Sequence, residues 1–238
     1  MSDSLVIIPT YNEKENVELM IKTVMNLPDG FEILIVDDNS PDGTSNIVQS
    51  LMQEFPERLH LLLRQEKNGL GKAYIAGFKW ALQKNYEYVF EMDCDFSHNP
   101  KDLIRLKNAC VNGADIAIGS RYCKDGKVKD WPIGRILMSF LASLYVRIVL
   151  WFPVHDTTAG FKCYRKKVLQ TLNLDAIQFT GYAFQIEMKY AAYKNGFKII
   201  EVPILFIDRL KGQSKMSIKI FKEALLGVLK MRLKNYKQ

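Results

Sequence analysis

Short apolar runs alternate with longer amphipathic stretches over the first 120 residues, and this alternation constrains the fold more than any other feature. The short runs predict buried strands, and the stretches between them predict helices. The predicted strands are 5–9, 31–36, 60–64, 86–92 and 114–119, and the predicted helices are 14–27, 44–55, 71–85 and 100–112. Strands that alternate with helices of this length indicate βαβ units and a mainly parallel sheet flanked by helices.

The pattern becomes less regular after residue 121. Residues 124–135 predict a loop, and residues 134–151 predict an apolar helix. The rest of the chain predicts strands at 158–164, 198–202 and 204–207, a helix at 182–195, and a basic amphipathic helix from about 217 to 234. The chain has no internal repeat and no linker rich in glycine, serine or proline. The sequence therefore predicts one α/β domain over residues 1–238, with a Rossmann-like sheet.

Polar clusters follow four of the predicted strands at their carboxyl ends. In chain order they read PTYNE, DDNSPDG, DCD and GSRY. Ligands of open α/β sheets bind beyond this edge, so four clusters there indicate a ligand site. The cluster DCD supplies Asp93 and Asp95, whose hard carboxylate oxygens suit Mg²⁺ or Mn²⁺, and such an ion can bridge them to a diphosphate. Taken alone, the same stretch could be a solvated loop before a helix capped by Asn99.

The run NGLGKA, with Gly69, Gly71 and Lys72, could suggest a phosphate-binding loop. It lacks the GxxxxGK[ST] spacing of a Walker A motif, so we predict that it only packs a helix start tightly. Ser97 or His98 could add a ligand to the predicted metal site or cap the following helix. Glu187 is expected to be a glutamate on a helix surface.

Charge and composition narrow the classes of partner. The net charge of +7 favours anionic partners such as phosphorylated ligands, an anionic membrane or nucleic acid. The chain carries no recognisable nucleic-acid-binding motif, so we expect no nucleic-acid partner. A hydrophobic content of 48% is that of a globular protein and excludes general disorder. The four cysteines lack metal-like spacing and are expected to be reduced thiols of a cytosolic protein.

With these motifs in view, the sequence resembles the dolichol- and polyprenol-phosphate mannosyltransferases, which are inverting GT-A glycosyltransferases. The resemblance covers nearly the whole chain. It rests on IPTYNEKENV, ILIVDDNSPDGT, NGLGKAYIAGF, MDCDFSHNP, IAIGSRY, TTAGFKCYRK and EVPILFIDRLKGQSK, which occur in this order. Cys94 stands at a position where alanine is common in that family, and we expect it to contribute only its backbone.

The resemblance implies a role for each motif. Residues of about 1–122 would bind the nucleotide sugar, and residues of about 123–238 would bind the acceptor and face a membrane. The implied donor site is formed by Pro9, Tyr11, Glu13, Val36, Asp38, Asp93, Cys94, Asp95, Arg121, Arg209 and Lys215. Asp93 and Asp95 would hold the metal, and Arg121, Arg135 and Ser139 would bind the acceptor phosphate. Asp95, Arg121 and Arg135 would be the catalytic residues.

The implied reaction is mannose transfer from GDP-mannose to dolichyl or polyprenyl phosphate, with inversion. Relatives that transfer glucose share most of these motifs, so glucose transfer from UDP-glucose remains the alternative. A module that binds a sugar nucleotide without catalysis is a second alternative.

Two helical segments predict contact with a membrane surface. Residues 136–152 contain Arg147 and fall short of the ~20 residues that span a bilayer, so we expect them to lie at an interface. The basic terminal helix would add attraction to anionic lipid. The predicted location is the cytoplasmic face of a membrane, peripherally bound, with a membrane-embedded partner subunit left open. The alternative is that both apolar stripes pack in the core or in a dimer interface.

Overall fold

The computed structural model describes residues 2–208 and 218–237, and it describes side chains for residues 2–208 and 226–237. The strands are β1 (Ser4–Thr10), β2 (Glu32–Asp37), β3 (Leu59–Leu63), β4 (Tyr88–Glu91), β5 (Ile116–Ser120), β6 (Lys127–Lys129), β7 (Lys162–Arg165), β8 (Ile199–Pro203) and β9 (Leu205–Ile207). The helices are α1 (Val17–Met25), α2 (Thr44–Glu54), α3 (Leu70–Leu82), α4 (Asp102–Val111), α5 (Ile133–Leu150), α6 (Lys166–Thr171), the 3₁₀ turn η1 (Leu174–Ala176), α7 (Tyr182–Lys194) and α8 (Ile218–Leu233).

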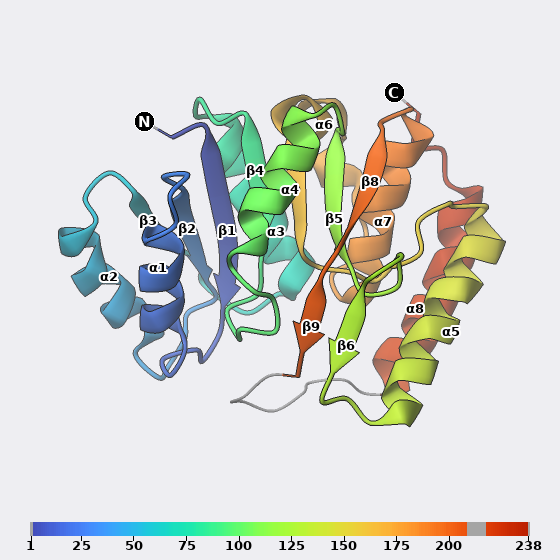
Figure 1. Ribbon diagram of the computed structural model, residues 1–238, viewed down its shortest axis with the longest axis horizontal. Helices are drawn as coiled ribbons and strands as arrows, with labels where there is room; N and C mark the ends of the chain where they lie inside the picture. Colours follow the sequence, from blue (N-terminus) through green and yellow to red (C-terminus); the bar gives the residue numbers. More distant parts are fainter. Residues whose placement is uncertain (1, 209–217, 238) are drawn as a thin grey trace.

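A seven-stranded sheet forms the centre of the molecule, in the order β3-β2-β1-β4-β7-β5-β8 (Figure 1). All neighbouring pairs are parallel except those of β7, which runs antiparallel between β4 and β5. The prediction of a mainly parallel sheet flanked by helices is therefore confirmed. The predicted strand at 158–164 is wrong at its start, because β7 begins only at Lys162.

Both faces of the sheet are covered by helices, because the central strands are apolar on both sides. Along β1, Leu5 and Ile7 pack into a core with α3, α7 and parts of α5 and α8. Val6 and Ile8 point the other way and pack against α1, α2 and α4. Alternate residues of a strand face opposite sides of the sheet, so one apolar run serves two cores.

A small two-stranded sheet of β6 and β9 lies below the main sheet in Figure 1. The prediction of an uninterrupted loop at 124–135 is wrong, because Lys127–Lys129 pair with Leu205–Ile207. The strand predicted at 204–207 is observed as β9, but Lys127–Lys129 shows no apolar pattern that could have indicated its partner. The helix predicted from residue 100 begins at Asp102, and Asn99 instead accepts a hydrogen bond from the backbone N–H of Lys101 in the turn before it.

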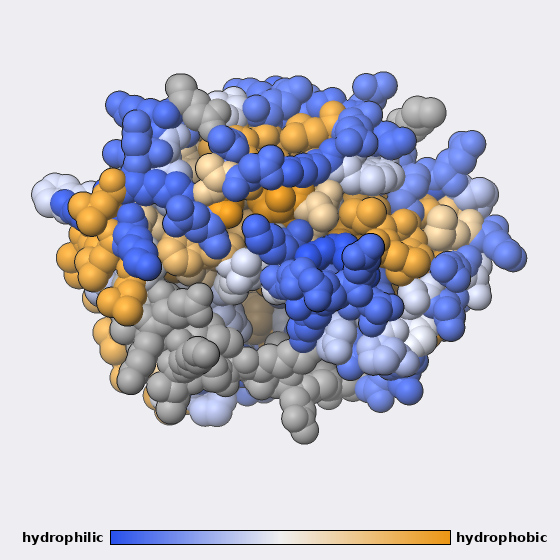
Figure 2. Space-filling view, turned by 180° about the vertical axis from the view of Figure 1, so that it is seen from behind, coloured by the Kyte–Doolittle hydropathy of each residue, from blue (hydrophilic) through white to orange (hydrophobic). Residues whose placement is uncertain are grey.

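Helices α5 and α8 lie side by side at one end of the sheet (Figure 1). The side chain of Arg232 on α8 donates a hydrogen bond to the backbone carbonyl of Val149 on α5. Apolar side chains gather over this edge, at the left of Figure 2. The exposed ones are Ile133, Leu137, Met138, Phe140, Leu141 and Ile148 of α5 and Leu226, Leu229 and Leu233 of α8; we call this set the α5–α8 apolar face.

Helix α5 is long and apolar enough to cross a membrane by length and composition, with a mean hydropathy of 1.7 and only 17% of its residues buried. It is the one such helix among the described residues. The alternative that its apolar stripe packs in the core is wrong for the exposed residues of the α5–α8 apolar face. The expectation that this segment lies at an interface without spanning stays a prediction.

Candidate active site

The carboxyl ends of β1 and β2 bring the first two polar clusters together. Asp38 follows β2 and pairs with Arg64, whose Nη1 lies 2.8 Å from the carboxylate. Burial raises the pKa of Asp38 above its ordinary value, although Arg64 opposes the shift. The preceding Asp37 is fully buried and accepts hydrogen bonds from the hydroxyls of Thr10 and Ser40. Asp37 therefore links the end of β1 to the loop after β2. Asp38 is the next carboxylate along the chain, at the carboxyl edge of the sheet.

Two other residues expected in the donor site belong to the strands themselves. Pro9 and Val36 are direct neighbours on β1 and β2. The side chain of Val36 is fully buried in the core against α3, so Val36 can offer a ligand only its backbone.

Tyr11 and Glu13 lie in the loop after β1. The ammonium of Lys67 lies 4.0 Å from the centre of the Tyr11 ring, so this ring already carries a cation on one face. Glu13 accepts a hydrogen bond from the side-chain amide of Asn16 at 2.9 Å, and its backbone N–H donates to the hydroxyl of Thr44. These bonds hold the loop between the starts of α1 and α2.

The two carboxylates of the DCD cluster lie just beyond β4. Asp95 is buried, and its Oδ1 accepts a hydrogen bond from the backbone N–H of Ser97 at 3.0 Å. Asp93 is more open, with 39% of its side chain exposed. Phe96 between Asp95 and Ser97 has a φ of 59°, a left-handed conformation that is unusual for a residue with a side chain. Such strained backbone persists where the surroundings hold it and is frequent at functional sites.

Cys94 turns away from this edge into the core under α1 and α4. Burial raises the pKa of its thiol well above the ordinary value, so the side chain is a neutral, inert thiol. This agrees with the expectation that Cys94 contributes only its backbone. The described cysteines are all free, as predicted.

His98 is buried behind the two carboxylates. Its ring stacks on Phe161 and meets the edge of Phe206, and its Nδ1 lies 4.0 Å from Asp93 Oδ2. Burial lowers the pKa of His98 to about 4, so the imidazole is neutral at neutral pH. The backbone carbonyl of the adjacent Ser97 accepts a hydrogen bond from Ile207 of β9. The small sheet therefore supports the DCD loop from below.

Arg121, directly after β5, is held by a partner that the sequence did not suggest. Its Nε and Nη2 donate to the two carboxylate oxygens of Asp156 at 2.7 and 2.6 Å, and Nη2 also donates to Thr158 at 2.8 Å. Burial alone would raise the pKa of Asp156, but Arg121 outweighs it and holds that pKa below its ordinary value. These bonds use three of the five N–H donors of the guanidinium. Arg121 is thus fixed in place by bonds that leave two of its five N–H donors unused.

Arg135 comes from the first turn of α5. Its Nη1 lies 3.0 Å from the carboxylate of Asp208, and its guanidinium lies 3.9 Å from the centre of the Trp131 ring. The guanidinium of Arg121 lies 5.5 Å from the centre of the same ring, so both arginines lie close to Trp131. Ser139 follows Arg135 one helical turn later, on the same side of α5. The structure therefore brings together the three residues expected to bind the acceptor phosphate.

Arg209 and Lys215, which were expected to contact the donor diphosphate, lie outside the described residues.

A buried polar cluster underlies the site, and sequence reasoning missed it. Lys162 of β7 lies 3.1 Å from Glu91 of β4, and both side chains are fully buried. Tyr164 donates to the other carboxylate oxygen of Glu91 at 2.8 Å, and Lys162 also donates to the side-chain oxygen of Gln185 on α7. Burial lowers the pKa of Lys162, although Glu91 opposes this. Charged residues inside apolar strands, as in FEMDCD and GFKCYR, were the available signal.

The glycine run before α3 packs tightly, as predicted. The backbone N–H of Gly71 donates to the carbonyl of Thr180 at 2.8 Å. A Cβ at residue 71 would lie 2.7 Å from the ring of Phe184, so only glycine allows α3 to approach α7 this closely. The neighbouring Lys72 is exposed.

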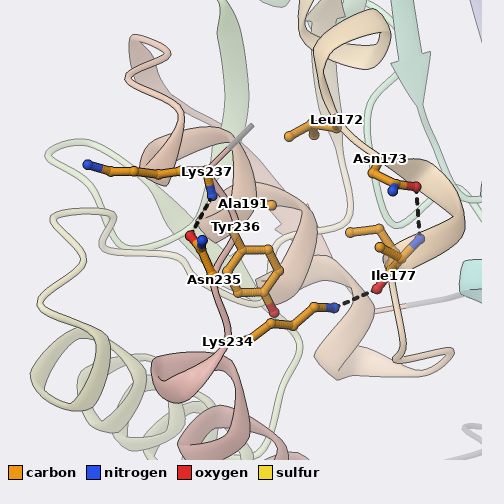
Figure 3. Close-up of a pocket in the computed structure, with 9 residues that line it drawn as sticks. Leu172, Asn173, Ile177, Ala191, Lys234, Asn235, Tyr236 and Lys237 are labelled. Atoms are coloured by element: carbon orange, nitrogen blue, oxygen red, sulfur yellow. Dashed lines mark hydrogen bonds between the residues drawn. The ribbon is translucent and has the colours of Figure 1, made fainter.

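The prediction that Glu187 lies on a helix surface is wrong. Its carboxylate is fully buried and accepts hydrogen bonds from the backbone of Gln178 and Phe179, from the hydroxyl of Tyr236 and from the ammonium of Lys234. Lys234 and Tyr236 line a cavity of about 220 Å³ between η1, α7 and the C-terminal segment (Figure 3). None of the described residues expected in the donor or acceptor site lines this cavity, and Glu187 anchors the end of the chain through Lys234 and Tyr236.

Comparison with known proteins decides the family. The family model of glycosyl transferase family 2 matches residues 5–172, which is more than half of the chain. The chain belongs to glycosyl transferase family 2. It is 46% identical over 225 residues to polyprenol monophosphomannose synthase of Mycolicibacterium smegmatis, covering 94% of this chain and 85% of that protein. It is 44% identical to undecaprenyl-phosphate mannosyltransferase of Micrococcus luteus, covering 96% and 93% of the two chains.

A third relative is the dolichol-phosphate mannosyltransferase of Pyrococcus furiosus, 38% identical over 95% of this chain and 62% of that protein. Among solved structures, glucosyl-3-phosphoglycerate synthase from Mycobacterium tuberculosis, in complex with Mn²⁺, UDP and glucosyl-3-phosphoglycerate, is similar with a TM-score of 0.68. That match covers 97% of this chain and 78% of the other, at 16% identity. At this identity the match shows the fold alone, which is the GT-A fold expected from the sequence.

The match to the family 2 model covers only some of the residues described above. Asp93, Asp95, Arg121 and Arg135 all lie within it, and so does Lys162 of the buried cluster. Gln185 and the anchor at Glu187 lie beyond its end at residue 172. The protein is a glycosyltransferase, and the whole of α7 lies beyond the part that the family model matches.

Proposed function

We propose that this protein transfers mannose from GDP-mannose to polyprenyl or dolichyl phosphate and inverts the anomeric carbon. The observation that carries the proposal is that a pair of carboxylates and a pair of arginines lie at the same edge of the sheet. Asp93 and Asp95 provide a carboxylate pair for a metal–diphosphate group, and Arg121 and Arg135 provide a cationic pair across Trp131. The names of the relatives at 46% and 44% identity support the acceptor and the sugar.

Residues of about 1–122 would bind the donor. Asp38 is a hydrogen-bond acceptor at the ends of β1 and β2, and it suits the hydroxyls of a ribose or the N–H groups of a base. Tyr11 offers a ring beside it. Arg121 would meet the diphosphate as well as the acceptor, because it follows β5 at the same edge.

Asp93 and Asp95 would hold Mg²⁺ or Mn²⁺. Their donor set fits a hard divalent cation, and the described residues hold no group of three His, Cys, Asp or Glu that could close a site without substrate oxygens. Bound there, the cation would stabilise the negative charge on the departing nucleoside diphosphate. The buried Asp95, fixed by the N–H of Ser97, would be the rigid ligand, and the more open Asp93 the adjustable one.

The reaction needs no general base from the protein. A phosphate monoester has its second pKa near ~6, so the lipid phosphate is already a nucleophile at neutral pH. The protein would therefore position the phosphate and screen its charge, through Arg121, Arg135 and Ser139. The ion pair with Asp156 would hold the guanidinium of Arg121 in the same orientation while substrates bind and products leave.

The α5–α8 apolar face supports peripheral binding to a membrane, where a polyprenyl acceptor would be found. We place the protein on the cytoplasmic face, where anionic lipids would attract its net positive charge. A membrane-embedded partner subunit would find its docking surface on the same face. Nucleic acid has no part in this proposal.

One assay tests the proposal against its alternatives. Purified protein receives radiolabelled GDP-mannose or UDP-glucose with a short polyprenyl phosphate and Mg²⁺, with EDTA added to a parallel sample. We expect label in the lipid fraction from GDP-mannose only, and none with EDTA or in Asp95→Asn. Asp175→Asn, at an exposed carboxylate paired with Lys79, is the matched control and should retain activity.

If only UDP-glucose gave label in the lipid fraction, the transferred sugar would be glucose and not mannose. Nucleotide-sugar binding without transfer of either sugar would make the chain a non-catalytic module.

A further inference from the structure

The side-chain amide of Gln185 has a fixed orientation. Lys162 donates a hydrogen bond to its oxygen Oε1, and both side chains are buried, with Gln185 2% exposed. A lysine ammonium has donors only, so the amide oxygen must face it. The amide nitrogen Nε2 must then point away from Lys162. The ion pair of Lys162 with Glu91 holds the ammonium in this place.

The amide nitrogen of Gln185 lacks an acceptor. Among the described residues, no oxygen lies within hydrogen-bond distance and angle of Nε2, although the atom is buried. An unsatisfied buried donor costs about 1–3 kcal/mol. A donor kept at this cost indicates an acceptor that lies outside the described residues, such as a bound ligand.

Gly160 shows where the acceptor would lie. A Cβ built at residue 160 would be 3.4 Å from Gln185 Nε2 and 3.9 Å from Asp93 Oδ2. The glycine therefore leaves open the space that the amide and the carboxylate share. Any side chain at this position would occupy that space. The amide thus faces the expected donor site from its buried side.

We propose that Gln185 donates a hydrogen bond to a hydroxyl of the transferred sugar, and that Lys162 is the positioning residue that orients the amide. The inference rests on the proposed function, because it takes the sugar nucleotide as the ligand of the Asp93 and Asp95 edge. It assigns part of sugar recognition to α7, beyond the match to the family model.

A hydroxyl is the group that fits both neighbours. It accepts a hydrogen bond from an N–H and donates its own hydrogen to a carboxylate, so it can bridge Gln185 and Asp93. A phosphate oxygen has no hydrogen to donate at neutral pH and would be repelled by Asp93 at this position. A site that hydrogen-bonds a substrate hydroxyl discriminates strongly against analogues that lack it.

Calorimetric binding tests the inference without relying on transfer. Gln185→Met keeps the length and apolar stem of the side chain and removes both donors. Wild type, Gln185→Met and the control Gln170→Met, at an exposed position of α6, are titrated with GDP and GDP-mannose, and with UDP and UDP-glucose, in Mg²⁺. We expect Gln185→Met to bind the sugar nucleotide about tenfold more weakly and to bind the nucleotide alone unchanged.

Deoxy analogues identify the hydroxyl. GDP-mannose lacking one hydroxyl at a time should show one position whose removal weakens binding to wild type more than tenfold but weakens binding to Gln185→Met much less, because only the bond to Asp93 remains to be lost there. That coupling is the signature of a direct contact. Equal affinity of wild type and Gln185→Met for the sugar nucleotide would overturn the inference and leave the proposed function intact. Failure of wild type to bind either sugar nucleotide would overturn both.

Lys162 needs a variant that keeps the fold. Lys162→Met alone leaves the buried Glu91 without its cation, so the test uses Glu91→Gln combined with Lys162→Met, which removes both charges. We expect this double variant to lose sugar-nucleotide affinity as Gln185→Met does, with nucleotide affinity unchanged. Adding Gln185→Met should cause no further loss. A double variant with normal sugar-nucleotide affinity would show that Lys162 does not orient the amide.

Discussion

Two arginines with different anchors form the cationic side of the site. Arg121 binds the buried Asp156 through the Nε and Nη2 edge of its guanidinium, and its side chain is 9% exposed. Arg135 is 25% exposed and pairs with Asp208, which is itself partly exposed. Arg135 can therefore exchange its partner for a phosphate at small cost, whereas Arg121 stays where Asp156 holds it.

This difference predicts the effect of Arg135→Ala. The variant should raise the KM for the lipid phosphate tenfold or more, because it removes the arginine that can turn to the acceptor. Affinity for GDP, measured by calorimetry, should stay within about twofold, since Arg135 is not among the residues proposed to bind the nucleotide. Arg105→Ala, at an exposed arginine of α4, is the control. An equal loss of GDP affinity would move Arg135 to the donor site.

Asp156→Asn tests the anchor of Arg121. The substitution keeps the shape of the side chain and leaves the buried guanidinium without a counter-charge, which should cost about 3 kcal/mol of unfolding free energy. Urea denaturation followed by circular dichroism measures the loss. Asp42→Asn, at a surface turn, is the comparison. If Asp156→Asn unfolded at the wild-type urea concentration, the ion pair would not stabilise the fold.

Residue types at strand ends were predictable, but their partners were not. Asp93, Asp95 and Arg121 stand beside turn-forming residues after apolar runs, so a short window of sequence locates them. Asp156 lies 35 positions from Arg121, and no local pattern links the two. Glu187 was misjudged because helix α7 is buried on nearly all sides, which its mixed polar and apolar sequence conceals.

At the scale of elements, the pair α5 and α8 is the surface that we propose for contact with a membrane. The two helices pack side by side, and their outward side chains form the α5–α8 apolar face. Arg135 and Ser139 lie on the first turns of α5, so this helix carries both the residues proposed to bind the acceptor phosphate and part of the α5–α8 apolar face. A membrane bound there would deliver the lipid phosphate beside Arg135.

This arrangement predicts salt-sensitive binding to vesicles. Wild type should float with liposomes that contain anionic lipid at low salt, because apolar burial and charge attraction act together. Leu137→Asp with Ile148→Asp should reduce the floating fraction severalfold, while Leu19→Asp, at an exposed site on α1, should not. A folded wild type that fails to float at low salt would instead assign the face to a dimer or partner interface.

Strong apolar periodicity allowed most elements to be predicted within a few residues. The elements missed were short and polar: β6, α6 and η1. Lys127–Lys129 is a strand only because β9 supplies a partner, so tertiary pairing overrides a sequence without strand propensity. The antiparallel direction of β7 could not be predicted from the sequence either, because both strands that it pairs with are remote in the chain.

At the scale of the whole molecule, buried tyrosines determine the behaviour at high pH. Burial, followed by the charge of Glu91, raises the pKa of Tyr164 well above its ordinary value, and burial with Glu187 does the same for Tyr236. In the unfolded chain these phenols lose their protons near pH 10, while in the folded chain they keep them. The unfolded state thus binds fewer protons, and stability falls as the pH rises above about 10.

Urea titrations between pH 8 and pH 11 measure this fall. Tyr164→Phe should reduce its slope, since phenylalanine has no proton to lose, although the variant is less stable at pH 8 without the bond to Glu91. Tyr193→Phe, at an exposed tyrosine, should leave the slope unchanged. A wild-type stability that stays level up to pH 11 would contradict the role of these phenols.

The position of β7 also governs how the chain can fold. β7 fills the gap between β4 and β5, and its residues lie more than 70 positions from their partners on β4. Contacts between such remote segments form late, because a long loop must close first. During synthesis, the edges of β4 and β5 that pair with β7 would stay unpaired until β7 has been made. The carboxylates after β4 and the arginine after β5 follow these unpaired strands. We therefore expect that a segment ending near residue 122 does not fold independently, and that a nascent chain of that length is prone to edge-to-edge aggregation.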